Sequence, residues 1–277
     1  MEETKLIIKD ILAKHADAPL FFKRNLIKEY LQVLVLDYIY SHPKYASLAF
    51  YGGSSLVHCY GLPRLSEDLD FVDIKKEIDL ELFAKDLEKF FADKTDLAVF
   101  AKVQKFRVYL KFPILKDIGI AGDNNSESDF LFLKVEIFKG IDFCAHYEIE
   151  IKPIFRFNKS VLVKTFDLPT LMATKIRAVL NRTWGKRDKT GEMVITVKGR
   201  DYFDLMWYLE KGVKPNLGCI ENNATIEELK KNILALVEKI DERSIILDLE
   251  NFIADQNFVK NLGTNIKDIL SKQIKEM

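Results

Sequence analysis

The stretch Gly52 to Phe71 reads GGSSLVHCYGLPRLSEDLDF and carries most of the information about fold and chemistry. In a strand, side chains two residues apart share a face, so Asp68 and Asp70 would project together while Leu69 enters the core. Two neighbouring carboxylates repel each other, and a hard divalent cation with oxygen ligands is the obvious partner for them. The spacing therefore predicts a metal-binding carboxylate pair.

A small-residue turn, Gly52-Gly53-Ser54-Ser55, stands ahead of the carboxylates. Backbone N–H groups and hydroxyls in such a turn suit phosphate oxygens, which indicates phosphoryl or nucleotidyl transfer beside a metal site. The alternative is a turn before an edge strand with two solvated aspartates, but it does not explain the crowding of polar residues after Pro63. The residues expected to contact the nucleotide here are Gly53, Ser54, Ser55, Arg64 and Ser66.

The longer string from Phe50 to Phe71 resembles the AbiEii-type nucleotidyltransferases of the polymerase-β-like superfamily. These are the toxin halves of abortive-infection and type IV toxin–antitoxin systems, and this chain departs from their usual motif by having Leu65 in place of Phe. The resemblance implies an α/β (α+β) fold with a mixed-sheet nucleotidyltransferase core and a C-terminal helical region. It also implies transfer of NMP from an NTP to an acceptor hydroxyl, with Mg²⁺ or Mn²⁺ at Asp68 and Asp70.

A third acidic ligand is expected from this resemblance, and Glu136 is the best candidate. Strand alternation places Lys134 and Glu136 on one face of the run FLKVEIF, with the apolar residues on the other. The alternative is that the two side chains form a surface ion pair. Glu148 and Glu150 are the next candidates.

Lys175 lies in a segment, Leu168 to Arg182, whose apolar spacing predicts a helix. A lysine in that stripe either extends its ammonium to the helix edge or is held in a cleft. The resemblance favours the cleft, because these enzymes carry a lysine near the nucleotide phosphates on the first helix after the core. Arg182, on the same helix face, would add charge that helps pyrophosphate leave.

The run KGRDYFDL, from Lys198 to Leu205, predicts the start of another helix. Arg200, Asp201 and Asp204 have the spacing that lets side chains meet on a helix surface. The resemblance implies that Asp204 acts as a general base or orients Lys175. The alternative is an acidic first turn that complements the helix dipole.

The segment from Asn181 to Thr190 is locally basic and contains Trp184. Basic side chains and an aromatic ring could hold an RNA end by phosphate contact and base stacking. A solvated loop between helices explains the same composition.

The pattern along the chain predicts helices at 20–41 and 79–92, with strands at 48–51, 97–103, 106–114, 130–138 and 146–156. Thr225 and Glu228 form a capping box before a further amphipathic helix. From about residue 166 the pattern becomes helical. We therefore expect a nucleotidyltransferase core over residues 1–165 and a helical region over residues 166–277.

Composition places no polyanion site by itself, because the 42 basic and 42 acidic residues give a formal net charge of zero. No apolar run is long enough to span a bilayer. The widely spaced cysteines, Cys59, Cys144 and Cys219, indicate reduced thiols in a cytosol, and the charged N-terminal residues are not those of a signal peptide. The sequence thus predicts a cytoplasmic protein.

By resemblance, the acceptor is expected to be a tRNA 3′ end, and the cellular outcome to be growth inhibition that a cognate antitoxin reverses. Two alternatives stay open from the residues alone. The enzyme could transfer NMP to a protein or small-molecule hydroxyl, or the chain could be a non-catalytic nucleotide-binding module. Intact Asp68, Asp70 and Lys175 argue against the second alternative.

Overall fold

The computed structural model describes residues 3–120, 129–182, 185–187, 191, 193–221 and 225–277. The chain forms two compact units. The first comprises Met1–Gly61, Leu65–Ile141 and Ile151–Thr165, and the second comprises Leu62–Arg64, Asp142–Glu150 and Phe166–Met277. Because two short segments ahead of residue 151 belong to the second unit, no single position in the sequence separates the two.

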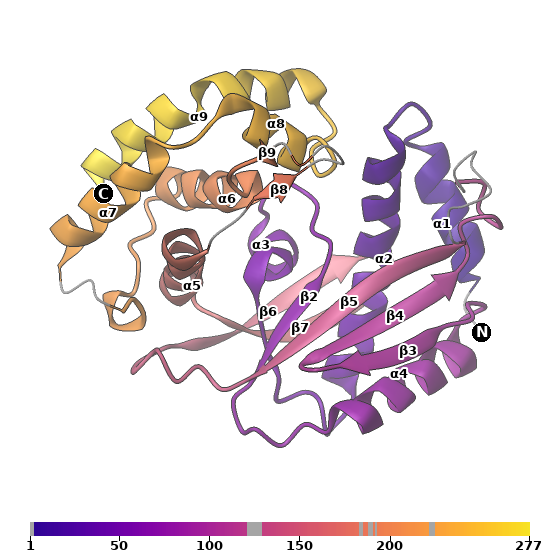
Figure 1. Ribbon diagram of the computed structural model, residues 1–277. Coiled ribbons are helices and arrows are strands. Elements are labelled where there is room, and N and C mark those ends of the chain that lie inside the picture. Colours follow the sequence, from indigo (N-terminus) through magenta and orange to yellow (C-terminus); the bar gives the residue numbers. More distant parts are fainter. Residues whose placement is uncertain (1–2, 121–128, 183–184, 188–190, 192, 222–224) are drawn as a thin grey trace. The chain divides into compact units, whose positions relative to one another are not determined.

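Within the described residues, the first unit is built on a seven-stranded sheet of order β3-β4-β5-β2-β1-β7-β6 (Figure 1). Strand β1 is antiparallel to β2 and parallel to β7, while β2 is parallel to β5, so the sheet is mixed. This confirms the predicted α/β fold with a mixed sheet. The strands are β1 (Ala49–Tyr51), β2 (Leu69–Asp73), β3 (Phe100–Gln104), β4 (Arg107–Pro113), β5 (Phe130–Lys139), β6 (Ile149–Arg156) and β7 (Lys159–Phe166).

Helix α2 (Leu20–Ser41) is the central helix of the first unit and confirms the predicted helix over the same residues. Leucine, valine and isoleucine are buried around most of its circumference, as expected for a helix enclosed in a core rather than lying on a surface. It packs on the sheet with α4 (Leu80–Lys94). The other helices of this unit are α1 (Thr4–Ala13) and α3 (Gly52–Tyr60).

The second unit is mainly helical, as the sequence predicts for this part of the chain. Thr225 caps α7 as predicted, because its hydroxyl accepts a hydrogen bond from the Glu228 N–H at 3.2 Å. In the part of the chain that the structure describes, no helix has the length and apolar character needed to cross a membrane. The elements are α5 (Leu168–Asn181), β8 (Lys186–Arg187), β9 (Met193–Ile195), α6 (Gly199–Glu210), the 3₁₀ turn η1 (Leu217–Cys219), α7 (Ile226–Val237), α8 (Glu242–Leu249) and α9 (Gln256–Glu276).

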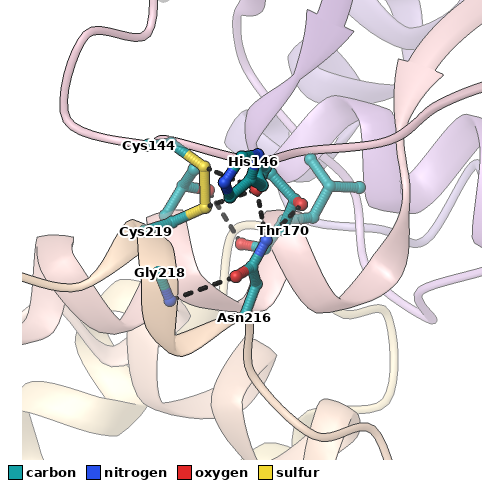
Figure 2. The surroundings of a disulfide bond; sticks show 8 residues. Cys144, His146, Thr170, Asn216, Gly218 and Cys219 are labelled. Atoms are coloured by element: carbon teal, nitrogen blue, oxygen red, sulfur yellow. Dashed lines mark hydrogen bonds between the residues drawn. A yellow bond between two sulfur atoms is a disulfide. The ribbon is translucent and has the colours of Figure 1, made fainter. Parts of the chain in front are cut away.

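Cys144 and Cys219 form a disulfide in the second unit although 75 positions separate them in the sequence (Figure 2). The prediction of three reduced cysteines is therefore wrong for this pair, and Cys59 is the free cysteine of the described residues. Beside the disulfide, the Asn216 amide donates a hydrogen bond to the His146 carbonyl at 2.7 Å (Figure 2). The disulfide and this amide together hold the segment Asp142–Glu150 on the second unit.

A buried set of hydrogen bonds fixes the chain just ahead of Asp68. His58 Nε2 and Gln32 Oε1 are 2.9 Å apart, and the Gln32 amide donates to the Ser66 carbonyl at 2.9 Å. His58 and Gln32 are buried, on α3 and α2 respectively. Helix α2 therefore supports both the first helix of the motif and the loop that follows it.

The buried imidazole of His58 should make folding stability depend on pH. Burial, with a smaller contribution from Arg156, lowers the pKa of His58 from its ordinary 6.5 to about 3. Below pH 6.5 His58 is protonated in the unfolded chain, whereas in the folded chain it stays neutral until about pH 3. Protonation therefore favours the unfolded chain, and stability should fall as the pH drops from 6.5 to about 3. Urea denaturation at several pH values should show a slope of up to about 1.4 kcal/mol per pH unit from this one group.

His58→Met should flatten that slope, because the variant has no imidazole to protonate in either state. His15→Gln is the matched control, since His15 is exposed. An unchanged slope in His58→Met would show that other groups produce the pH dependence.

Candidate functional site

Gly52 brings the start of α3 against the Asp70 carboxylate. Its φ angle is +78°, a conformation that favours glycine, and a Cβ built there would lie 2.3 Å from Asp70 Oδ2. In the sheet, Tyr51 is the direct neighbour of Asp70. The helix already begins at Gly52, whereas the sequence predicts a turn through Ser55, so the carboxylate lies next to the free N–H groups of a helix N-terminus.

The two serines of this helix start have different surroundings, although both are fully buried. The Ser55 hydroxyl of α3 is 2.9 Å from the Thr165 hydroxyl of β7, so it has a partner within the protein. The Ser54 hydroxyl is buried and has no hydrogen-bond partner among the described residues. Ser54 thus has an unused polar atom at a helix N-terminus, where a phosphate oxygen is a favourable partner.

The predicted carboxylates lie together on one face of the sheet. Asp70 and Glu136 are direct neighbours on β2 and β5, while Leu69 and Phe71 are fully buried on the opposite face. The Lys134 ammonium lies 2.8 Å from both Asp68 Oδ2 and Glu136 Oε1. The Lys134–Glu136 ion pair considered from the sequence is therefore present, and it also includes Asp68.

Glu136 receives a second cation, because Arg107 Nε donates to its Oε1 at 2.8 Å. Within the described residues, no group of three histidine, cysteine or acidic side chains is arranged to hold a metal ion. Glu136 is thus paired with two basic residues, Lys134 and Arg107. The sequence analysis does not assign either of them to the site. Its role as a third metal ligand stays a prediction.

Asp68 carries the electrostatic signature of a group that would gain from further positive charge. Burial raises the pKa of Asp68 above its ordinary value, and Lys134 offsets this only in part. A divalent cation beside Asp68 and Asp70 would favour the ionised form of both. The two aspartates therefore fit a hard divalent metal ion.

The second unit contains a buried ion cluster centred on Asp204 of α6. Arg64 donates to both Asp204 oxygens, from Nε at 2.6 Å and from Nη2 at 2.7 Å, and Lys175 Nζ lies 2.7 Å from Oδ2. Burial alone would raise the pKa of Asp204, but Arg64 and Lys175 outweigh it and hold the pKa below its ordinary value. An ionised, fully buried carboxylate with two cationic partners is suited to orienting Lys175 rather than to accepting a proton.

Lys175 is held by two acidic residues in this cluster. Besides Asp204, its ammonium lies 2.9 Å from Asp201 Oδ1, and Arg182 Nη1 lies 2.6 Å from Asp201 Oδ2. Burial lowers the pKa of Lys175, but Asp201 and Asp204 outweigh it and raise the pKa above its ordinary value. Lys175 is thus a fixed cation and not a side chain that extends freely to the helix edge.

Arg64, Ser66 and Arg200 have partners that the sequence does not predict. Arg64, expected along the phosphate edge, directs its guanidinium to Asp204, and the Ser66 carbonyl accepts from Gln32. Arg200 pairs with Asp248 at 3.3 Å, and Asp204 has Arg64 and Lys175 as partners. Trp184 and the segment 188–190 of the basic loop lie outside the described residues.

A family of known proteins matches most of this sequence, including the motif. The sequence matches the family described as "Nucleotidyl transferase AbiEii toxin, Type IV TA system" over residues 35–274. The chain belongs to the AbiEii family. Its members are nucleotidyltransferase toxins of type IV toxin–antitoxin systems, which confirms the resemblance stated from the motif. No curated protein sequence matches this AbiEii protein.

Two solved Helicobacter pylori structures are similar to this AbiEii protein. JHP933 has 17% sequence identity and a TM-score of 0.44, with 91% of this chain and 94% of that chain covered. A protein described as "putative nucleotidyltransferase" has 18% identity and a TM-score of 0.45, with 91% of this chain and 96% of that chain covered.

Proposed function

We propose that this AbiEii protein transfers NMP from an NTP to the 3′ hydroxyl of an RNA acceptor, with tRNA as the substrate. The observation that carries the proposal is the Asp70 carboxylate lying against the N-terminus of α3. Helix N–H groups suit phosphate oxygens and a carboxylate pair suits a divalent cation, so one place offers partners for both parts of a metal–nucleotide complex.

The nucleotide-binding roles follow from the contacts described above. Backbone N–H groups at Gly53 and Ser54, with the unused Ser54 hydroxyl, would hold phosphate oxygens. Asp68 and Asp70 would hold Mg²⁺ or Mn²⁺, which supplies positive charge to the phosphate oxygens when bound. Lys175 would supply a further fixed positive charge as pyrophosphate forms, with Asp204 as its positioning residue.

The reaction is an in-line displacement at the α-phosphorus. The acceptor hydroxyl oxygen forms a bond to phosphorus, the bond between phosphorus and the α–β bridging oxygen breaks, and pyrophosphate carries away the electron pair. The acceptor hydroxyl loses its proton to solvent or to an aspartate of the pair. Asp204 is not the base in this scheme, because it is fully buried and ion-paired with Arg64 and Lys175.

The cellular consequence proposed is growth inhibition that an antitoxin encoded alongside reverses. Modified tRNA 3′ ends would not be charged with amino acids, so translation would stop. These substrates place the activity in the cytoplasm, where thiol reductants would act on the disulfide between Cys144 and Cys219.

A labelling experiment tests the proposal. The pure protein is incubated with each α-³²P-labelled NTP and Mg²⁺, in the presence of total tRNA, total RNA or cell lysate. Label in tRNA supports the proposal. Label in protein or in small molecules would show that the enzyme uses another acceptor. Absence of label with every NTP and acceptor would refute nucleotidyl transfer by this chain.

Lys175→Met should reduce transfer by about 100-fold or more, because the variant keeps the apolar stem and loses the charge. Arg64 stays beside Asp204, and Arg182 beside Asp201, so each acid retains a cationic partner. Stability should fall much less than activity. Steady-state kinetics and urea denaturation of the same preparations give the two quantities.

Arg177→Met is the matched control, because Arg177 lies on the same helix and pairs with exposed Glu221. We expect it to retain normal transfer. Normal transfer in Lys175→Met as well would restrict Lys175 to a structural role in the cluster.

A further inference from the structure

One face of strands β3, β4 and β5 is partly solvent-exposed, whereas the residues of the opposite face are mostly buried. Residues that point to the core side of these strands, such as Val108, Leu133 and Val135, are fully buried, and α4 packs on that side. The alternating residues point the other way. We call their surface the basic aromatic face, formed by Phe100, Lys102, Arg107, Tyr109, Lys111, Phe130, Phe132 and Lys134 (strands in Figure 1).

The charge of these strands is strongly one-sided. Glu136 is the one acidic residue in the sequences of the three strands, whereas Lys102, Arg107, Lys111 and Lys134 all lie on the basic aromatic face. Among the described residues, no carboxylate forms an ion pair with Lys102 or Lys111. In a chain of zero formal net charge, this local excess of cations favours a polyanion.

Aromatic rings alternate with the cations. Phe100 and Phe132 are 54% and 42% exposed, and they flank Lys111 across the sheet register. The Lys111 ammonium lies 5.8 Å from the centroid of the Phe132 ring, and the Phe100 and Phe130 centroids are 6.2 Å apart. Large apolar rings left in water next to cations suit flat, anionic ligands such as nucleotides.

The face runs directly into the carboxylates of the proposed active site. Lys102, Tyr109 and Lys134 form one row across the three strands, and Lys134 contacts Asp68. Along β5, the distance from Phe130 to Glu136, six residue positions further on, is about 20 Å. A strand of RNA lying on this face could therefore reach Asp68 and Asp70 with its end while a few nucleotides contact the sheet.

We propose that the basic aromatic face binds the single-stranded 3′ segment of an RNA acceptor. Phenylalanine rings would stack on bases, and Lys102 and Lys111 would contact phosphates. Sheets that read single-stranded RNA in this way stack two or three bases on aromatic side chains. A protein acceptor offers no regular row of anions to match these cations. The inference rests on the proposed function for the identity of the acceptor.

The test measures RNA binding separately from catalysis. The probe is a short fluorescein-labelled single-stranded RNA, titrated by anisotropy at several salt concentrations without NTP. The double variant Lys102→Gln/Lys111→Gln should lower the slope of log K against log salt by about 1.4, from about 0.7 per lost phosphate contact. Phe100→Ala/Phe132→Ala should weaken binding about tenfold or more.

Matched control variants remove the same groups from other surfaces. Lys85→Gln/Lys89→Gln changes two exposed lysines of α4, and Phe155→Ala removes a ring on β6 that is 74% exposed. These controls should bind RNA like the native protein. NTP binding with Mg²⁺ should be unchanged in all four proteins, because none of these residues belongs to the proposed nucleotide site.

The outcomes separate this inference from the proposed function. Weaker RNA binding in both face variants, with normal binding in the controls, supports RNA binding by the basic aromatic face. This holds even if the native protein transfers no nucleotide and the proposed function fails. Unchanged RNA affinity and salt slope in both face variants would show that the basic aromatic face does not bind RNA. Label in tRNA would then still support the proposed function. Label in protein with no RNA binding would overturn both.

Discussion

Asp70→Asn is expected to abolish nucleotidyl transfer, lowering kcat by about three orders of magnitude or more. The change removes one negative charge beside the N-terminus of α3 and keeps the shape of the side chain. Asp70 is only partly buried, and its neighbours Leu69 and Phe71 supply the core contacts of β2, so the fold should persist. Single-turnover transfer of labelled NMP measures the effect.

Asp68→Asn should behave in the same way. The change removes the ion pair of Asp68 with Lys134, but Lys134 keeps Glu136 as a partner, so the fold should persist. Binding of Mn²⁺, followed by electron paramagnetic resonance, should weaken in both variants and stay normal in Asp93→Asn, which changes an exposed residue of α4. Near-native turnover in Mg²⁺ in either variant would show that the aspartate pair does not hold the catalytic metal.

Asp204→Ala should be the most destabilising single change, lowering the free energy of unfolding by about 3–5 kcal/mol. The variant removes the carboxylate that both Arg64 and Lys175 contact, and loss of a compensating charge beside two buried cations is costly. Because domains of this size are stable by only about 5–15 kcal/mol, the change should remove a large fraction of the total stability. Chemical denaturation at lower temperature measures the difference.

A double-mutant cycle with Arg64→Met distinguishes the ion pair from simple loss of volume. If the buried pair carries the effect, Arg64→Met and Asp204→Ala together should cost less than the sum of the single changes. Strict additivity of the two free energies would contradict the assigned coupling between Arg64 and Asp204.

The sequence predicts the frame of the first unit well, because its signals are local. Helix α2 is delimited by Pro19 and by the His42-Pro43 step, and the alternation in β5 places Glu136 on the face opposite to Val135 and Ile137. Helix α1 and strand β7 were not predicted. Both segments mix polar and apolar residues, and their structure depends on the core against which they pack.

The ion partners could not be predicted from spacing. Arg64 and Asp204 are 140 positions apart, and helix geometry alone suggested Arg200 as the partner of Asp204. The structure gives Arg200 to Asp248 instead. Likewise, Lys134 was identified as a partner of Glu136, but its contact with Asp68 requires the parallel pairing of β2 with β5.

The sequence predicts a turn at Gly52, where the structure has the start of a helix, because the local composition is that of a turn. Two glycines and two serines are typical of turns, and only the close approach of Asp70 explains why glycine is needed there while the following serines are helical. A residue's role in this motif thus depends on its neighbour across the sheet.

The placement of Leu62–Arg64 in the second unit bears on how such proteins can evolve. Modular proteins exchange whole segments by recombination at a single junction, and each half folds as before. Here a crossover near residue 165 would separate Arg64 from the inherited partner of its buried charge, Asp204. Functional chimaeras should therefore take Arg64 and Asp204 from the same parent. Recombination among relatives should likewise keep these two positions together.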